Sequence, residues 1–189
     1  AIGFDMNISS ADFHALLARA HGVGLSLTRF GEAELKAGSN MQVVARHGVG
    51  YDMIDVPALT RARVPLMITG VANSPSVAEH ALYLMLELAK RGIAFHDMVA
   101  ENRWNDRMRQ GLPIDLFEKT VLIVGFGKIG SRLGKMCLAF GMRVCVYDPY
   151  VAATHIATAG CQAETNLNDA LAKAEKAKET LVRLKRAGG

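Results

Sequence analysis

Residues 119–150 read KTVLIVGFGKIGSRLGKMCLAFGMRVCVYDPY, and this stretch decides the fold of the chain. Lys119–Val124 is rich in β-branched, apolar residues, which is typical of a buried strand in a parallel sheet. The glycine-rich segment Gly125–Gly130 follows directly, and a helical pattern continues to about Phe140. Met142–Tyr147 has the composition of a second strand. This order of elements predicts a βαβ unit.

The glycines stand at the G-x-G-x-x-G spacing of a dinucleotide-binding turn. Gly125 permits the tight turn, Gly127 lets the backbone approach a pyrophosphate, and Gly130 lets helix and strand pack closely. The free amides around Lys128 and Ile129 are expected to point at the phosphates, whose charge the helix dipole favours. The alternative is a glycine-rich turn in a sheet that binds nothing.

An acidic residue, Asp148, stands at the end of the second strand, where the motif places the group that contacts the ribose. Its carboxylate can accept both hydroxyls of the adenosine ribose, and it would repel a 2′-phosphate. No arginine adjoins Asp148. We therefore predict NAD as the cofactor in preference to NADP.

The first third of the chain alternates helix and strand patterns, which predicts another parallel sheet. The expected strands are Val23–Thr28, Met41–Arg46 and Pro65–Thr69. The expected helices begin after a cap at Ser9 or Ser10, at Gly31 and after a cap at Asp55.

The strongest helix pattern covers about Pro75–Arg91. Ser76 and Glu79 fit a capping box, and Ser74 followed by Pro75 is a competing start. The helix is apolar nearly all round, so we expect burial on several sides, at a subunit interface or between two domains. The polar segment Gly92–Pro113 is expected to be a connector, with Trp104 as its packing anchor.

Composition favours a globular protein, with 50% hydrophobic and 21% charged residues. The net charge of +4 is mild, and we expect neither a nucleic-acid nor a membrane partner. No signal peptide is visible in the sequence, and its longest nearly uninterrupted apolar run, Ala81–Ala89, contains Glu87 and is about half a membrane span. The three cysteines form no C-x-x-C pair, so we expect structural thiols in a reducing compartment, the cytoplasm, and no metal site.

Several stretches together resemble the D-isomer-specific 2-hydroxyacid dehydrogenase family, which includes D-3-phosphoglycerate dehydrogenase. They occur in the family's order, over roughly Asn40 to Ala174, and are Arg46–Asp52 (RHGVGYD), Ser76–His80 (SVAEH), Trp104 and Lys119–Pro149. The resemblance implies a substrate domain, an NAD-binding domain, and hydride transfer between nicotinamide and a small D-2-hydroxy acid such as 3-phosphoglycerate.

The resemblance also implies site residues. Backbone amides of Gly48, Val49 and Gly50 would hold the substrate carboxylate, and a glycine loop after a parallel strand can form such an anion nest. Val77 would lie against the nicotinamide, and Pro149 would join Asp148 in the cofactor site. The family counterparts of Glu79 and His80 are structural, so neither is expected to be catalytic.

The family's catalytic arginine and glutamate–histidine pair lie after further strands, and we find no catalytic residue in this sequence. Glu175–Ala187 has a helical pattern where the family would continue with another core strand, and the front of the sequence looks short. We therefore expect a truncated dehydrogenase that is inactive by itself. The alternatives are an NAD(H)-binding module without turnover and an inactive structural fragment.

The fold expected from all these features is α/β. A flavodoxin-like parallel-sheet substrate domain would cover residues 1–73, and an incomplete Rossmann domain would cover residues 74–189. The expected partners are a small 2-hydroxy or 2-oxo acid and a second copy of the chain, which would form a homodimer through the helix at residues 75–91.

Overall fold

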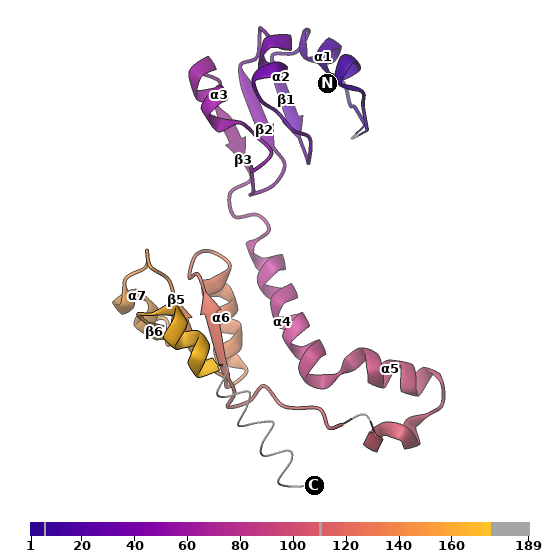
Figure 1. Ribbon diagram of the computed structural model, residues 1–189, viewed down its shortest axis with the longest axis vertical. Coiled ribbons are helices and arrows are strands. Elements are labelled where there is room, and N and C mark those ends of the chain that lie inside the picture. The colour runs from indigo at the N-terminus through magenta and orange to yellow at the C-terminus, as the bar shows by residue number, and fades with distance from the viewer. Residues whose placement is uncertain (6, 110, 175–189) are drawn as a thin grey trace. The chain divides into compact units, whose positions relative to one another are not determined.

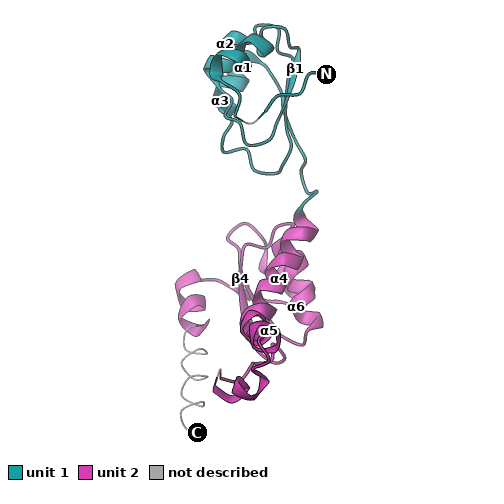
Figure 2. Ribbon diagram, turned by 90° about the vertical axis from the view of Figure 1, so that its right-hand side faces the viewer, with its two compact units in different colours: residues 1–73 teal, residues 74–189 magenta. Residues whose placement is uncertain are grey.

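The computed structural model describes residues 1–5, 7–109 and 111–174. It divides into two compact units, Ala1–Asn73 and Ser74–Gly189 (Figure 2). Each unit combines helices with a parallel three-stranded sheet, so the predicted α/β fold class is confirmed. The helical pattern predicted at Glu175–Ala187 lies outside the described residues.

The first unit contains a sheet in the order β1-β2-β3 (Figure 1). Its elements are α1 (Ser10–Leu17), β1 (Gly22–Leu25), α2 (Glu32–Ala37), β2 (Val43–Arg46), α3 (Val56–Ala62) and β3 (Leu66–Ile68). The predicted caps form, because the Ser9 side chain accepts from the Asp12 amide at 3.1 Å and Asp55 accepts from the Ala58 amide at 2.9 Å. The helices and the sheet enclose a core of nine buried residues, among which Leu17, Leu25 and Phe30 are each only 1% exposed.

The second unit has a parallel sheet in the order β4-β5-β6, preceded by helices. Its elements are α4 (Ser74–Lys90), α5 (Gly92–Ala100), the 3₁₀ helix η1 (Trp104–Arg109), β4 (Thr120–Val124), α6 (Gly130–Ala139), β5 (Arg143–Tyr147), α7 (Ala153–Thr158) and β6 (Gln162–Glu164). The βαβ unit predicted from the sequence of residues 119–150 is present as β4, α6 and β5. Its register pairs Val124 with Tyr147, so the carboxyl ends of β4 and β5 meet at one edge of the sheet.

Helix α4 begins at Ser74, so the capping box predicted at Ser76 does not form and the competing start is the correct one. Ser76 therefore lies inside the first turn of α4, directly after Pro75. Proline is tolerated this early in a helix, because the N–H that it lacks would have no intrahelical partner there. Burial on several sides is also not seen within this unit. Ala78 and Ala89 are buried and α4 packs against α6, whereas Leu88 on another side is 81% exposed.

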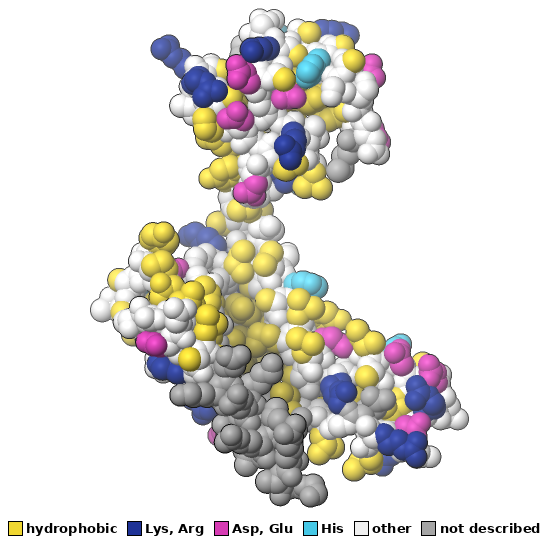
Figure 3. Space-filling view, in the orientation of Figure 1, with side chains coloured by type: hydrophobic (Ala, Val, Ile, Leu, Met, Phe, Trp, Pro, Cys, Tyr) yellow, Lys and Arg dark blue, Asp and Glu magenta, His cyan; other side chains and the backbone are white. Residues whose placement is uncertain are grey.

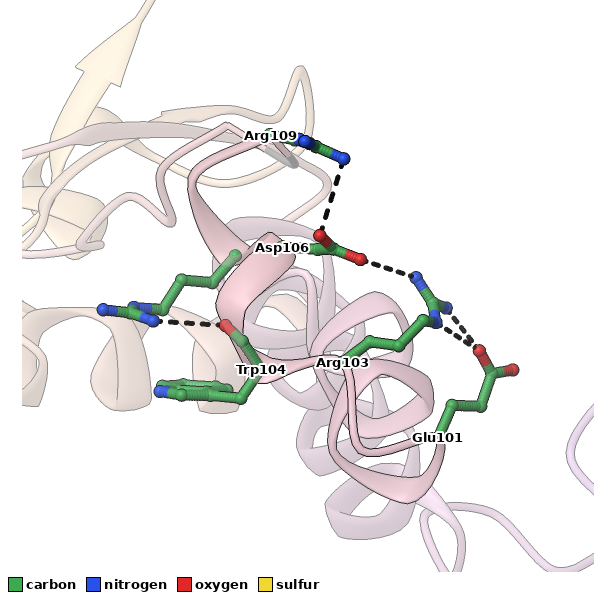
Figure 4. Close-up of polar contacts among 6 residues, drawn as sticks. Glu101, Arg103, Trp104, Asp106 and Arg109 are labelled. Atoms are coloured by element: carbon green, nitrogen blue, oxygen red, sulfur yellow. Dashed lines mark hydrogen bonds and ion pairs between the residues drawn. The ribbon is translucent and has the colours of Figure 1, made fainter.

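The segment predicted as a polar connector contains α5 and η1, which is a correction. Arg91 adopts a left-handed conformation (φ 56°) and separates α4 from α5. Trp104 links the two short helices, because its ring lies 6.1 Å from that of Phe95 and the Arg107 guanidinium stacks 5.4 Å from its centre. Figure 4 shows this region, where Asp106 also pairs with neighbouring arginines. Trp104 nevertheless remains half exposed.

The three cysteines are free thiols that belong to the second unit. Cys137 and Cys161 are buried, and Cys145 on β5 is half-buried. Burial raises the pKa of all three thiols, because it disfavours the thiolate.

Two features are absent from the part of the chain that the structure describes. None of its helices has the length and apolar character needed to span a bilayer. Nor do three or more histidine, cysteine or carboxylate side chains gather there as a metal ion would require.

Candidate functional site

The turn between β4 and α6 has a shape that depends on two glycines. Gly125 has a φ of 94°, a conformation that favours glycine, and its amide donates to the Tyr147 carbonyl at 2.8 Å. A Cβ added at Gly130 would lie 2.0 Å from the Gly125 carbonyl oxygen. Helix α6 can therefore begin against the turn only because residue 130 has no side chain.

The centre of the same turn is open. A Cβ added at Gly127 would meet no atom within 4 Å, so this glycine is not required for packing within the protein. Lys128 and Ile129 are exposed, and no side chain caps the start of α6 at Ile129. The turn thus leaves an open cradle at a helix N-terminus, which suits a pyrophosphate.

Asp148 lies at the end of β5, beside this turn. Its Oδ2 accepts a hydrogen bond from the Phe126 amide at 2.6 Å, and its Oδ1 accepts from the Tyr150 amide at 2.8 Å. These amides, that of Phe126 above all, hold the pKa of the Asp148 carboxyl below its usual range. The carboxylate is therefore ionised at neutral pH and fixed in orientation, while exposed Pro149 continues the chain past it.

Sequence reasoning missed the two amides that fix Asp148. The Tyr150 contact had a local signal, because aspartate commonly bonds the amide two residues later. The Phe126 contact had none, because it joins residues that only the parallel pairing of β4 and β5 brings together.

The remaining cofactor residue suggested by the family resemblance, Val77, lies in the first turn of α4 with a partly exposed side chain. This end of α4 and the β4–α6 turn lie at the same end of the second unit (Figures 1 and 2). Glu79 does not cap the helix, since α4 starts at Ser74, and it is exposed. His80 is also exposed and stacks on Tyr83, with ring centres 5.8 Å apart.

The predicted substrate loop, Gly48–Gly50, follows β2 in the first unit. Gly48 has a φ of 149°, and its amide donates to the Arg46 carbonyl at 2.9 Å, so this amide is already engaged. Among the described residues the structure gives no acceptor for the amides of Val49 and Gly50. Two of the three predicted donors thus remain available to an anion.

The sequence matches the family model described as the NAD-binding domain of D-isomer-specific 2-hydroxyacid dehydrogenases over residues 82–177, just over half of the chain. A D-3-phosphoglycerate dehydrogenase of Synechocystis is 35% identical over 136 residues, which are 72% of this chain and 24% of that protein. A hydroxypyruvate reductase of Thermotoga maritima is 37% identical over 115 residues, which are 61% of this chain and 37% of that protein. The chain thus spans about a quarter of the length of the first relative and just over a third of the length of the second.

Solved structures show the same fold. The D-lactate dehydrogenase of Aquifex aeolicus, complexed with NAD and lactic acid, has a TM-score of 0.73 and 26% identity, covering 80% of this chain and 45% of that one. The NAD⁺-bound 3-phosphoglycerate dehydrogenase of Entamoeba histolytica has a TM-score of 0.66 and 24% identity, covering 86% and 46%.

Proposed function

Since the chain belongs to the D-isomer-specific 2-hydroxyacid dehydrogenase family, whose NAD-binding domain it matches, we propose that its second unit binds NAD(H) for hydride transfer to and from a small D-2-hydroxy acid. The observation that carries the proposal is the β4–α6 turn, where an open glycine cradle lies beside an ionised Asp148. We assign no catalytic residue among those that the structure describes, because the family's catalytic arginine and glutamate–histidine pair are expected after further strands.

The residues of the proposed site would contact different parts of the cofactor. The amides of Gly127, Lys128 and Ile129 would hold the pyrophosphate, while Gly125 and Gly130 shape the turn. Asp148 would accept the adenosine ribose hydroxyls, Pro149 would border that ribose, and Val77 would contact the nicotinamide. The cofactor, when bound, supplies the hydride donor or acceptor.

The substrate class rests on the Gly48–Gly50 loop and on the relatives. The amides of Val49 and Gly50 suit a carboxylate, the group that all 2-hydroxy and 2-oxo acids share. Its relatives include a D-3-phosphoglycerate dehydrogenase and a hydroxypyruvate reductase, so we propose a small acid of this kind.

The free thiols support a cytoplasmic setting, since disulfides are rare in reducing compartments.

Calorimetric titration of the 189-residue protein with NADH tests the cofactor proposal. We expect saturable binding with one site per chain. Heat of binding that is indistinguishable from dilution would contradict the proposal.

Asp148 should set the choice of cofactor. We expect the unmodified protein to bind NADH at least about tenfold tighter than NADPH, because hydrogen bonds to a charged carboxylate favour the ribose hydroxyls and a 2′-phosphate is repelled. Asp148→Asn should narrow this preference, whereas Asp97→Asn, which removes an exposed carboxylate from α5, should leave it unchanged. Equal affinity of the unmodified protein for NADH and NADPH would show that the role given to Asp148 is wrong.

We also propose a homodimer through the exposed side of α4 and the start of α5. Apolar side chains gather along this part of the second unit (Figure 3). The most exposed of them are Tyr83, Leu84, Leu88 and Ile93. Contiguous exposed apolar residues mark interaction surfaces, and a second copy of the same helix is their simplest complement.

Leu88→Glu should convert the dimer to a monomer. Leu88 is 81% exposed, so a charge there leaves the fold intact but would be buried against the second copy. Light scattering at micromolar concentration measures the mass. Leu27→Glu is the matched control, since Leu27 is an exposed leucine of the first unit and its substitution should leave a dimer. A monomeric unmodified protein would refute the interface.

A further inference from the structure

Phe126 belongs to the site through its backbone and to the core through its ring. Its amide donates to Asp148 Oδ2 at 2.6 Å, while the Tyr150 amide occupies Oδ1 at 2.8 Å. Both carboxylate oxygens are therefore oriented by the protein itself. Of these two donors, only Phe126 comes from the turn that would hold the pyrophosphate.

The ring of Phe126 is anchored below the turn. It is 4% exposed and belongs to the core cluster that includes Ile123, Cys137, Ile156 and Cys161. Gly134 on α6 lies beside it, since a Cβ there would make an ordinary van der Waals contact of 3.4 Å with Phe126 Cε2. From α7, His155 lies against the ring at 6.4 Å between centres, with the planes at 73°. The ring thus contacts both helices that flank β5 in the chain.

The neighbours of Phe126 give the turn no side-chain anchor, although the Gly125 amide donates to the Tyr147 carbonyl at 2.8 Å and the Gly127 carbonyl accepts from the Ser131 amide at 3.0 Å. Gly125 and Gly127 carry no side chains, and a Cβ at either position would meet nothing within 4 Å. Glycine is the residue with the greatest backbone freedom, so an unanchored Gly-X-Gly turn could move its central amide away from Asp148. Within the Gly125–Gly127 segment, the buried ring of Phe126 is the side chain that can oppose this movement.

We propose that Phe126 is a positioning residue for cofactor selection, whose buried ring holds its amide against Asp148 so that this carboxylate faces the adenosine ribose. The proposal rests on the NAD(H)-binding function proposed above. It assigns to a core aromatic residue an effect on the discrimination between a ribose 2′-hydroxyl and a 2′-phosphate.

Phe126→Ala should weaken NADH binding by about tenfold, the effect of losing an oriented charged hydrogen bond, while NADPH binding should change less. The ratio of the NADH affinity to the NADPH affinity should therefore become smaller. Phe126→Leu, which refills most of the space, should restore it. Met142→Ala is the matched control, because it opens the same core beyond the amino end of β5 and should lower stability without changing the preference. Circular dichroism checks folding, and if Phe126→Ala does not fold, Phe126→Val should show the same narrowing.

A second readout needs no cofactor. The Phe126 amide is the main reason why the pKa of Asp148 is low, so Phe126→Ala should raise this pKa toward the ordinary carboxyl value, whereas Met142→Ala should not. Carboxyl-detected NMR titration of the protein alone measures it. An unchanged pKa together with an unchanged NADH preference in folded Phe126→Ala would overturn the inference. Failure of the unmodified protein to bind NADH would instead refute the proposed function, and the inference with it.

Discussion

Gly127→Val is expected to weaken NADH binding by at least about 100-fold, because its branched side chain displaces the pyrophosphate from at least two charge-assisted hydrogen bonds. The structure separates this effect from folding. A Cβ at Gly127 meets no protein atom within 4 Å, and the residue does not have a positive φ, so the variant should fold normally. Calorimetry gives the affinity, and thermal unfolding gives the stability.

The matched control is Gly24→Val. Gly24 lies on β1 in the first unit, and a Cβ there also meets nothing within 4 Å, but no ligand is proposed beside it. We expect Gly24→Val to bind NADH as the unmodified protein does. Unchanged affinity in Gly127→Val would mean that the β4–α6 turn does not hold the pyrophosphate.

Gly130→Ala should destabilise the second unit by about 3 kcal/mol or more, because overpacking against backbone cannot be relieved by a rotamer change. The added Cβ would lie 2.0 Å from the Gly125 carbonyl oxygen, so the start of α6 must shift away from the turn. NADH binding should be lost together with stability, since the same turn carries the site. Denaturant unfolding and calorimetry measure the two effects.

The control for this change lies one turn further along α6. A Cβ at Gly134 makes ordinary contacts, the shortest of them 3.4 Å to Cys161 Sγ and Phe126 Cε2. Gly134→Ala should therefore fold, bind NADH and gain up to about 1 kcal/mol from the better helix propensity of alanine. If Gly130→Ala were as stable as Gly134→Ala, the close packing of turn and helix described above would be wrong.

The β4–α6–β5 unit could be predicted because its signals are local. A β-branched strand, a glycine turn and a helix ended by Gly141 (φ 70°) stand in sequence order, and each fixes the conformation of its own residues. Helix α5 was missed for the opposite reason. Its residues are mostly apolar, with only His96 and Asp97 interrupting them, and only Met98 is buried, so its apolar residues form no separate stripe that indicates a helix.

In the candidate site, too, some features have a local sequence signal and others do not. The spacing of Gly125, Gly127 and Gly130 predicts a phosphate-binding turn, and Asp148 at the end of the next strand predicts a ribose contact. What holds that acid in place depends on the lateral pairing of β4 with β5, which no spacing along the chain encodes. The start of α4 depended on a choice between two serines on either side of Pro75, Ser74 and Ser76, that local capping rules alone do not decide.

The distribution of the cysteines makes the two units separately observable. Cys137, Cys145 and Cys161 all lie in the second unit, and residues 1–73 contain no cysteine. Burial shields Cys137 and Cys161 from alkylating reagents in the folded protein, whereas Cys145 is only half-buried. Alkylation of Cys137 and Cys161 must therefore wait for the Rossmann core to open, and the rate at these two thiols reports that opening. Pulsed alkylation followed by mass spectrometry would thus measure local opening of the second unit, with no signal from the first unit, which contains no cysteine.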